Sequence, residues 1–209
     1  IMQFFYGIDG NYTDITDSIM KNSTINEYIV IPVTDTARST IHGDPVPGEL
    51  KHIKLCDKNG SVNIWANDSC IIDTNTCEMA INDPRYFWDK IGRLVELKEM
   101  QLELLHRVMP FVFGSLKEEY PEQLMAVLYL DPDARVLEIG GNIGRNSCII
   151  GTILNDDKNL VTLECCNESA EKLKYNRNLN SLEFHIEASA LSKVPLIQKD
   201  WETKVAIPN

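Results

Sequence analysis

The sequence has no long hydrophobic run and few basic residues. No stretch approaches the roughly 18 uninterrupted apolar residues that a membrane-spanning helix needs, and no basic segment precedes an apolar one near residue 1. Twenty Lys and Arg residues against 31 Asp and Glu give a formal net charge of −11. Because phosphate contacts need clustered Lys and Arg, this balance argues against nucleic acid as a partner. We therefore expect a cytoplasmic protein without a membrane span.

The sequence also has no paired-cysteine motif. None of its six cysteines forms a C-x-x-C pair, and the adjacent Cys165 and Cys166 have the wrong spacing for a usual zinc site. We expect free thiols in a reducing compartment rather than a disulfide framework, and no metal site. The length of 209 residues allows one large or two small domains.

Residues 1–80 have the pattern of a small β-rich accessory module. β-Branched and aromatic residues alternate with turn formers, including the hairpin-type signals Asp9-Gly10 and Asn59-Gly60. The strands that we expect cover residues 4–8, 28–33, 50–55, 62–66 and 70–72. Residues 38–48 predict a Pro- and Gly-rich loop, in which His42 and Asp44 form a polar site or, as we favour, Asp44 holds an ordinary turn.

Residues 81–209 predict a helical segment followed by an α/β domain. Asp83 can cap a helix whose first turn contains Pro84, and an amphipathic pattern then continues until Pro110. Five apolar residues at helical spacing are expected to pack in the core: Leu94, Leu97, Met100, Leu104 and Val108. The aromatic residues 86–88 would line a substrate or adenine pocket or, as we favour, anchor one domain on the other.

Strands and helices alternate after Pro121. We expect helices at residues 121–130, from Gly144 to about 154, and at about 168–178, with strands at 135–139, 160–163 and 183–188. A β-α-β-α-β series of this kind predicts a parallel sheet with right-handed crossovers. The predicted fold class is therefore α/β with a Rossmann-like sheet, whose ligands bind beyond the C-terminal strand ends.

The turn after the first of these strands carries the strongest functional signal. Residues 136–144 read Val-Leu-Glu-Ile-Gly-Gly-Asn-Ile-Gly, an apolar run that ends in Glu138 and opens into Gly140, Gly141 and Gly144. A dinucleotide turn needs G-x-G-x-x-G to approach a pyrophosphate, so this spacing makes an NAD-dependent oxidoreductase the weakest interpretation. An acidic strand end with spaced glycines suits a ligand with an ammonium, a carboxylate and ribose hydroxyls but no phosphate. S-adenosyl-L-methionine is such a ligand.

Individual residues predict separate contacts to that cofactor. Glu164 ends the next strand about twenty residues beyond the glycine turn, where a carboxylate can accept both hydroxyl hydrogens of a ribose. Glu138 would face the methionine end or, alternatively, cap backbone N–H groups of the turn. The three glycines would let the backbone approach the ligand where a Cβ would collide. Asn142 tolerates positive φ and offers its side chain to the methionine carboxylate or to the turn.

The motifs resemble those of the FkbM family of S-adenosylmethionine-dependent methyltransferases. The resemblance rests on residues 136–144, on Leu163-Glu164, and on Ala190-Leu191-Ser192, and it departs from the family pattern at Gly141, often Ala, and at Cys165, where proline is common. It implies O-methylation of a hydroxyl on a sugar or glycan, with Ser189 and Ala190 flanking the adenine. The segment before residue 80 is similar to accessory segments of glycan-modifying proteins in large DNA viruses, which implies a viral protein in the host cytoplasm or the virion.

No residue of the sequence can be assigned as the catalytic base. The later acidic motifs of the resembling family follow the third strand, and the sequence stops at Asn209 before they could appear. A non-catalytic binding or structural module that keeps the methyltransferase fold is therefore a serious alternative. The strand at 136–139 is expected to be a sheet edge, which predicts an incomplete domain that continues in a longer polypeptide or pairs with a partner chain. We expect no methyl transfer by these 209 residues alone.

Overall fold

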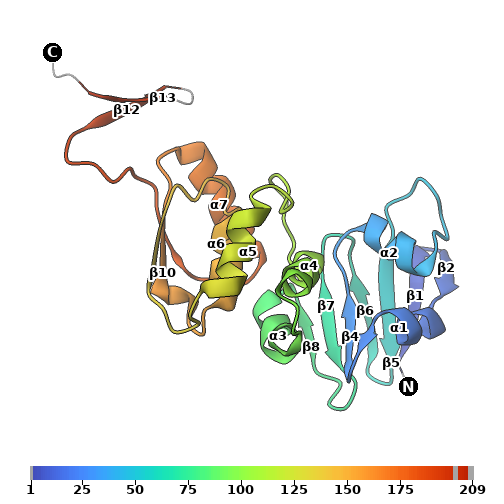
Figure 1. The fold of residues 1–209 in the computed structure, drawn as a ribbon. Coiled ribbons are helices and arrows are strands. Elements are labelled where there is room, and N and C mark those ends of the chain that lie inside the picture. Colours follow the sequence, from blue (N-terminus) through green and yellow to red (C-terminus); the bar gives the residue numbers. More distant parts are fainter. Residues whose placement is uncertain (1, 200–201, 207–209) are drawn as a thin grey trace. The chain divides into compact units, whose positions relative to one another are not determined.

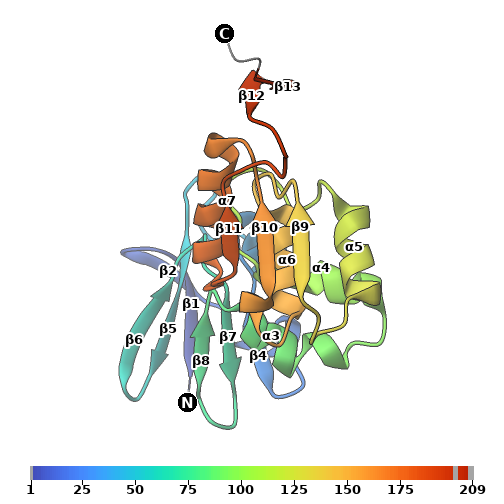
Figure 2. The same cartoon turned by 90° about the vertical axis from the view of Figure 1, so that its left-hand side faces the viewer.

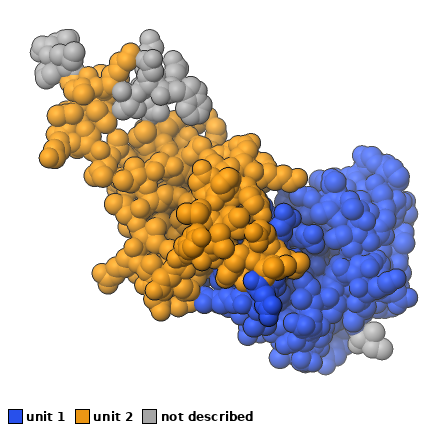
Figure 3. Space-filling view, viewed as in Figure 1, with its two compact units in different colours: residues 1–96, 103–110 blue, residues 97–102, 111–209 orange. Residues whose placement is uncertain are grey.

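In the computed structural model, which describes residues 2–199 and 202–206, contacts within the chain separate two units. Unit 1 comprises residues 1–96 and 103–110, and unit 2 comprises residues 97–102 and 111–209 (Figure 3). Residues 81–96 and 103–110, which we expected to belong to the second domain, thus make their contacts within the first. Each unit is described by itself.

Unit 1 contains two four-stranded antiparallel sheets, as the β-rich prediction required (Figure 1). One sheet has the order β2-β1-β5-β6 and the other the order β3-β4-β7-β8. The strands of the first are β1 (Gln3–Ile8), β2 (Asn11–Asp14), β5 (His52–Asp57) and β6 (Gly60–Ile64). Those of the second are β3 (Thr24–Ile25), β4 (Tyr28–Ile31), β7 (Cys70–Asp73) and β8 (Met79–Ile81). Apolar side chains of both sheets form one buried cluster that includes Phe4, Ile29, Ile53 and Ile72.

Two short helices of unit 1 are absent from the sequence prediction, α1 (Thr16–Asn22) and α2 (Asp35–His42). The loop predicted over residues 38–48 is therefore wrong for its first part. Thr34 caps α2 by accepting a hydrogen bond from the Ala37 N–H, and the fully buried Arg38 donates to three backbone carbonyls, which anchors the helix. The turn interpretation of Asp44 is confirmed, because its carboxylate accepts from the Val46 N–H at 3.1 Å.

The single long helix predicted up to Pro110 is also wrong. Asp83 caps α3 (Pro84–Lys90) as expected, but the chain then forms a 3-10 turn, η1 (Gly92–Leu94), and starts again as α4 (Lys98–Val108). The break changes the phase of the apolar pattern. Leu94 and Leu97 are 68% and 62% exposed, and Met100 is also exposed, whereas Val108 is buried as predicted together with Leu102 and Leu105.

Unit 2 has the predicted α/β fold with a Rossmann-like parallel sheet in the order β11-β10-β9. Its strands are β9 (Val136–Ile139), β10 (Leu160–Leu163) and β11 (His185–Glu187), and its helices are α5 (Tyr120–Tyr129), α6 (Arg145–Ile153) and α7 (Asn167–Leu179). A 3-10 turn, η2 (Asp157–Asn159), precedes β10, and a separate hairpin follows, formed by β12 (Leu196–Lys199) and β13 (Glu202–Val205).

The three helices of unit 2 lie on one face of its sheet, as Figures 1 and 2 show from two sides. Leu160 and Leu173 are buried in that layer. On the sheet, Leu137 and Ile139 are 58% and 63% exposed. The prediction that β9 is an edge strand is confirmed. We also expected other parts of the protein to cover both faces of this strand, and no such cover is found among the described residues.

The six cysteines all lie in the described part of the chain, and each is a free thiol. Within residues 2–199 and 202–206, no group of three His, Cys, Asp or Glu side chains is placed to hold a metal ion. None of the helices described is both long enough and apolar enough to cross a membrane.

Candidate cofactor site

The glycine turn leaves β9 at its C-terminal end and is tied to the end of the neighbouring strand. The Gly140 and Gly141 N–H groups both donate to the Leu163 carbonyl, at 2.8 and 3.0 Å. Three residues of the turn have left-handed backbone conformations: φ is +83° at Gly140, 50° at Asn142 and +92° at Gly144. The positive φ predicted for Asn142 is therefore present. The turn has one defined shape that delivers the chain into α6.

Gly140 and Gly141 are required at this turn for different structural reasons. A Cβ on Gly140 would meet no atom within 4 Å, so its requirement is the left-handed backbone. A Cβ on Gly141 would lie 2.2 Å from Thr162 Cγ2 and 2.8 Å from Leu173 Cδ1. Gly141 therefore allows the turn to pack on the protein interior, rather than clearing space for a ligand as we expected.

Glu164 is brought onto the glycine turn, as its strand-end position predicts. The residue is 8% exposed, and its Oε2 accepts from the Asn142 N–H at 2.7 Å while its Oε1 accepts from the Cys166 N–H at 2.7 Å. Each carboxylate oxygen has a second lone pair, so two further hydrogen bonds remain available. Glu164 thus fixes the turn, and its role in holding a ribose stays a prediction.

Glu138 points from β9 to the first turn of α6. Its Oε1 accepts from Asn146 Nδ2 at 3.1 Å, and its Oε2 accepts from the hydroxyls of Ser147 and Thr162. These partners are side chains, in contrast to the backbone N–H groups that we considered as an alternative. The carboxylate is therefore held in place by three donors from two elements.

Asn146 lies beside Glu138 and is not among the site residues predicted from the sequence. Its Nδ2 donates to Glu138, but its Oδ1 is buried and has no hydrogen-bond partner among the described residues. A buried amide oxygen without a donor is unfavourable by about 1–3 kcal/mol, which favours a ligand that supplies an N–H or O–H group. The signal that could have identified it is a polar residue in the first turn of the helix that follows the glycine turn.

Ser189 and Ala190 lie after β11, and both are exposed. The Glu164 N–H donates to the Glu187 carbonyl at 3.0 Å, so the ends of β10 and β11 are adjacent. The two residues therefore start from the same edge of the sheet as the turn. Their expected place beside the adenine stays a prediction.

Asn176 of α7 holds a segment that precedes α5 against the glycine turn. Its fully buried Oδ1 accepts from the N–H groups of Val112 and Phe113, at 3.1 and 3.4 Å. Its Nδ2 donates to the Ile143 carbonyl at 3.0 Å and to the Phe113 carbonyl at 3.4 Å. One amide side chain thus joins α7, the glycine turn and residues 112–113.

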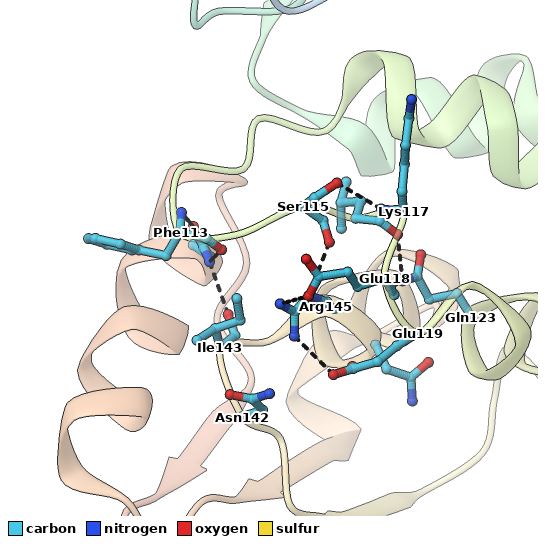
Figure 4. Close-up of polar contacts among 12 residues, drawn as sticks. Phe113, Ser115, Lys117, Glu118, Glu119, Gln123, Asn142, Ile143 and Arg145 are labelled. Atoms are coloured by element: carbon cyan, nitrogen blue, oxygen red, sulfur yellow. Dashed lines mark hydrogen bonds and ion pairs between the residues drawn. The ribbon is translucent and has the colours of Figure 1, made fainter.

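Arg145 fixes the next part of the same segment (Figure 4). This residue is 8% exposed, and its Nε donates to the Ser115 carbonyl at 3.0 Å. Its two terminal nitrogens pair with Glu118 and Glu119. Residues 115–119 are therefore held against the start of α6 by partly buried polar contacts.

The thiols and histidines of unit 2 show no catalytic base. Burial raises the pKa of the Cys148 thiol far above its usual value. Hydrogen bonds from Ser169 lower the pKa of Cys166, which precedes α7. His185 is at the beginning of β11 and faces Glu187, with 3.5 Å between Nε2 and Oε2. Because ligands of such sheets bind beyond the opposite strand ends, His185 is not placed to serve the site.

Comparison with known proteins finds partial likenesses among solved structures. No protein-family model and no curated protein matches the chain. A protein assigned as an O-methyltransferase from Klebsiella pneumoniae is 21% identical with a TM-score of 0.30, and the match covers 50% of this chain and 49% of that one. An O-methyltransferase from Bacillus cereus, in complex with SAH, is 20% identical with a TM-score of 0.28, and the match covers 50% of this chain and 47% of that one. The chain spans about half the length of these structures, and TM-scores this low establish no function.

Proposed function

We propose that unit 2 binds S-adenosyl-L-methionine at the glycine turn and belongs to an FkbM-like O-methyltransferase that acts on a sugar or glycan hydroxyl. The observation that carries the proposal is the pair Glu138 and Asn146. Asn146 Nδ2 donates to the Glu138 carboxylate at 3.1 Å, and Asn146 Oδ1 has no hydrogen-bond partner among the described residues. A carboxylate and a neutral acceptor are the partners that an ammonium group requires.

The backbone of the turn argues against a pyrophosphate ligand. Phosphates bind where helix N-terminal N–H groups are free to donate. Here the N–H groups of Gly140, Gly141, Asn142 and Gly144 already donate to protein acceptors, one of them the Glu164 carboxylate. A pyrophosphate would find no free donor among these four N–H groups and would face two carboxylates. The glycine turn itself therefore disfavours an NAD-dependent oxidoreductase, as the spacing does.

Different residues of the site fit different groups of the proposed cofactor. Glu138 and Asn146 would hold the methionyl ammonium, Glu164 would accept from the ribose hydroxyls, and Ser189 with Ala190 would flank the adenine. The cofactor supplies an electrophilic methyl group, and the protein's contribution is to align it with an acceptor oxygen. The sugar or glycan hydroxyl as acceptor rests on the FkbM resemblance alone.

Calorimetric titration tests the proposal. We expect the chain to bind S-adenosylmethionine and S-adenosylhomocysteine and not NAD. Replacing Asn146 with Ala should weaken S-adenosylhomocysteine about tenfold, because one hydrogen bond from a charged donor is lost. Asn167→Ala, at an exposed asparagine of α7, is the matched control and should bind as the unchanged chain does. Binding of NAD in place of both methionine-derived ligands would overturn the proposal.

Turnover that depends on an acceptor would distinguish an enzyme from the alternative of a non-catalytic module. A methyltransferase assay with S-adenosylmethionine and a panel of glycans would measure S-adenosylhomocysteine release. Binding with no release is expected of these 209 residues under either interpretation, so it does not by itself favour the non-catalytic module. Release that depends on a glycan acceptor favours the enzyme.

A further inference from the structure

An aromatic row crosses the sheet β2-β1-β5-β6 on the face opposite the buried core of unit 1. The strand register pairs Tyr12 and His52 on either side of Gly7, and the pairing of Ile53 with Ile64 places Trp65 next to His52. Ile53 and Ile64 are fully buried, so their chain neighbours His52 and Trp65 point to the other face. Figure 2 shows these four strands side by side.

The row is held rigidly. The rings of His52 and Trp65 have centroids 4.5 Å apart, and those of Tyr12 and His52 lie 5.5 Å apart at an interplanar angle of 84°. The Tyr12 hydroxyl donates to Asp9 Oδ1 at 2.8 Å and lies 2.7 Å from His52 Nε2. His52 is only 5% exposed between its neighbours. The row therefore keeps its shape without a ligand.

Trp65 is nevertheless 55% exposed, so much of the row's largest side chain is accessible to solvent. Charges of both signs surround the row: Asp9 is exposed, and the Lys54 ammonium lies 5.8 Å from the centre of the Tyr12 ring. Lys54 already occupies the position that a cationic ligand would take over Tyr12. Mixed charge around an open indole therefore suits a neutral ligand with an apolar face and many hydroxyls.

We propose that this row is a binding site for a neutral saccharide. The C–H face of a pyranose stacks on the exposed Trp65 ring, and its hydroxyls hydrogen bond to Asp9 and to the Tyr12 hydroxyl. Asp9 can do so because its Oδ1 bonds to Tyr12, which leaves Oδ2 for a ligand. The site lies wholly in unit 1 and does not depend on the proposed function of unit 2.

Fluorescence and NMR titration of the whole chain with cellobiose, maltotriose and chitotriose tests this proposal. We expect at least one of them to change the Trp65 signal with a millimolar Kd. Trp65→Ala should weaken that saccharide about tenfold, whereas Trp65→Phe should retain part of the affinity. Tyr129→Ala removes an exposed aromatic ring of unit 2 and should leave the affinity unchanged.

Three outcomes would overturn the proposal. The first is that none of the saccharides binds, and the second is that Trp65→Ala binds them as the unchanged chain does. The third is that choline, used as a cationic probe, binds at Trp65 in their place. Because Trp65 is mostly exposed, both Trp65 variants are expected to fold, and a thermal melt of each confirms that before titration.

Discussion

Replacing Glu164 with Ala should affect both the stability of unit 2 and its affinity for the cofactor. In the structure, the carboxylate accepts from the Asn142 and Cys166 N–H groups at 2.7 Å each. A buried donor that loses its acceptor is unfavourable by about 1–3 kcal/mol. Both amides are partly buried, so water satisfies them in part and we take the lower end for each. The expected loss is about 2 kcal/mol, or a fall in the Tm of unit 2 of roughly 8–16 °C.

The cofactor affinity falls by a separate amount. Hydrogen bonds to a charged acceptor contribute on the order of 1.5–3 kcal/mol each, so loss of the ribose contacts should weaken S-adenosylhomocysteine about ten- to a hundredfold. Calorimetry at a temperature well below the Tm of the variant measures this loss of affinity without a contribution from unfolding. Glu164→Gln keeps one acceptor oxygen but turns an NH₂ group toward a backbone donor. Its affinity for S-adenosylhomocysteine should therefore lie between those of the unchanged chain and of Glu164→Ala.

The two readouts can fail independently. A folded Glu164→Ala variant with unchanged affinity for S-adenosylhomocysteine would remove Glu164 from the cofactor site. An unchanged Tm would instead contradict the inference that this carboxylate fixes the glycine turn.

Three further predictions follow from particular contacts. Gly141→Ala should destabilise unit 2 by more than 2 kcal/mol in chemical denaturation, because its Cβ would overlap buried atoms, whereas Gly140→Ala should cost about 1 kcal/mol from backbone strain alone; equal effects would refute the assigned reasons. Burial lowers the pKa of His42 to about 4, so the folded state favours the neutral ring, and the stability of unit 1 should fall as the pH decreases from about 6.5 towards 4; His42→Gln should flatten that dependence in denaturation at several pH values. Leu137→Thr combined with Ile139→Thr should reduce any self-association of the chain in light scattering, since both residues are exposed on an edge strand.

The secondary structure of unit 2 is predictable because its local signals agree. Apolar β-branched strands alternate with helical patterns, and Glu138 and Glu164 mark the strand ends where turns begin. The exposure of Leu137 and Ile139 is not predictable in the same way. An apolar strand pattern indicates that the side chains of a strand are suited to burial, but it does not show which face of the strand another element covers.

The errors in unit 1 have a different origin. A helical period continues through Leu94 and Leu97, so the pattern gives no sign that η1 breaks the helix and shifts its phase. Helix α2 contains two threonines and has low intrinsic propensity, and tertiary contacts of the buried Arg38 stabilise it instead. Such contacts join residues far apart in the sequence, and a local pattern cannot reveal them.

The residues that best mark the glycine turn in the sequence are also needed to fold it. Glu164 anchors backbone N–H groups, Gly141 packs on Thr162, and Glu138 is bonded to the first turn of α6. Loss of cofactor binding in variants of these residues therefore has two explanations unless stability is measured in parallel. Asn146 Oδ1 differs because no group in the described part of the chain donates to it. A change of affinity on losing this oxygen, with the Tm little changed, would report the ligand contact itself, and this makes Asn146 the most direct test of a cofactor at the turn.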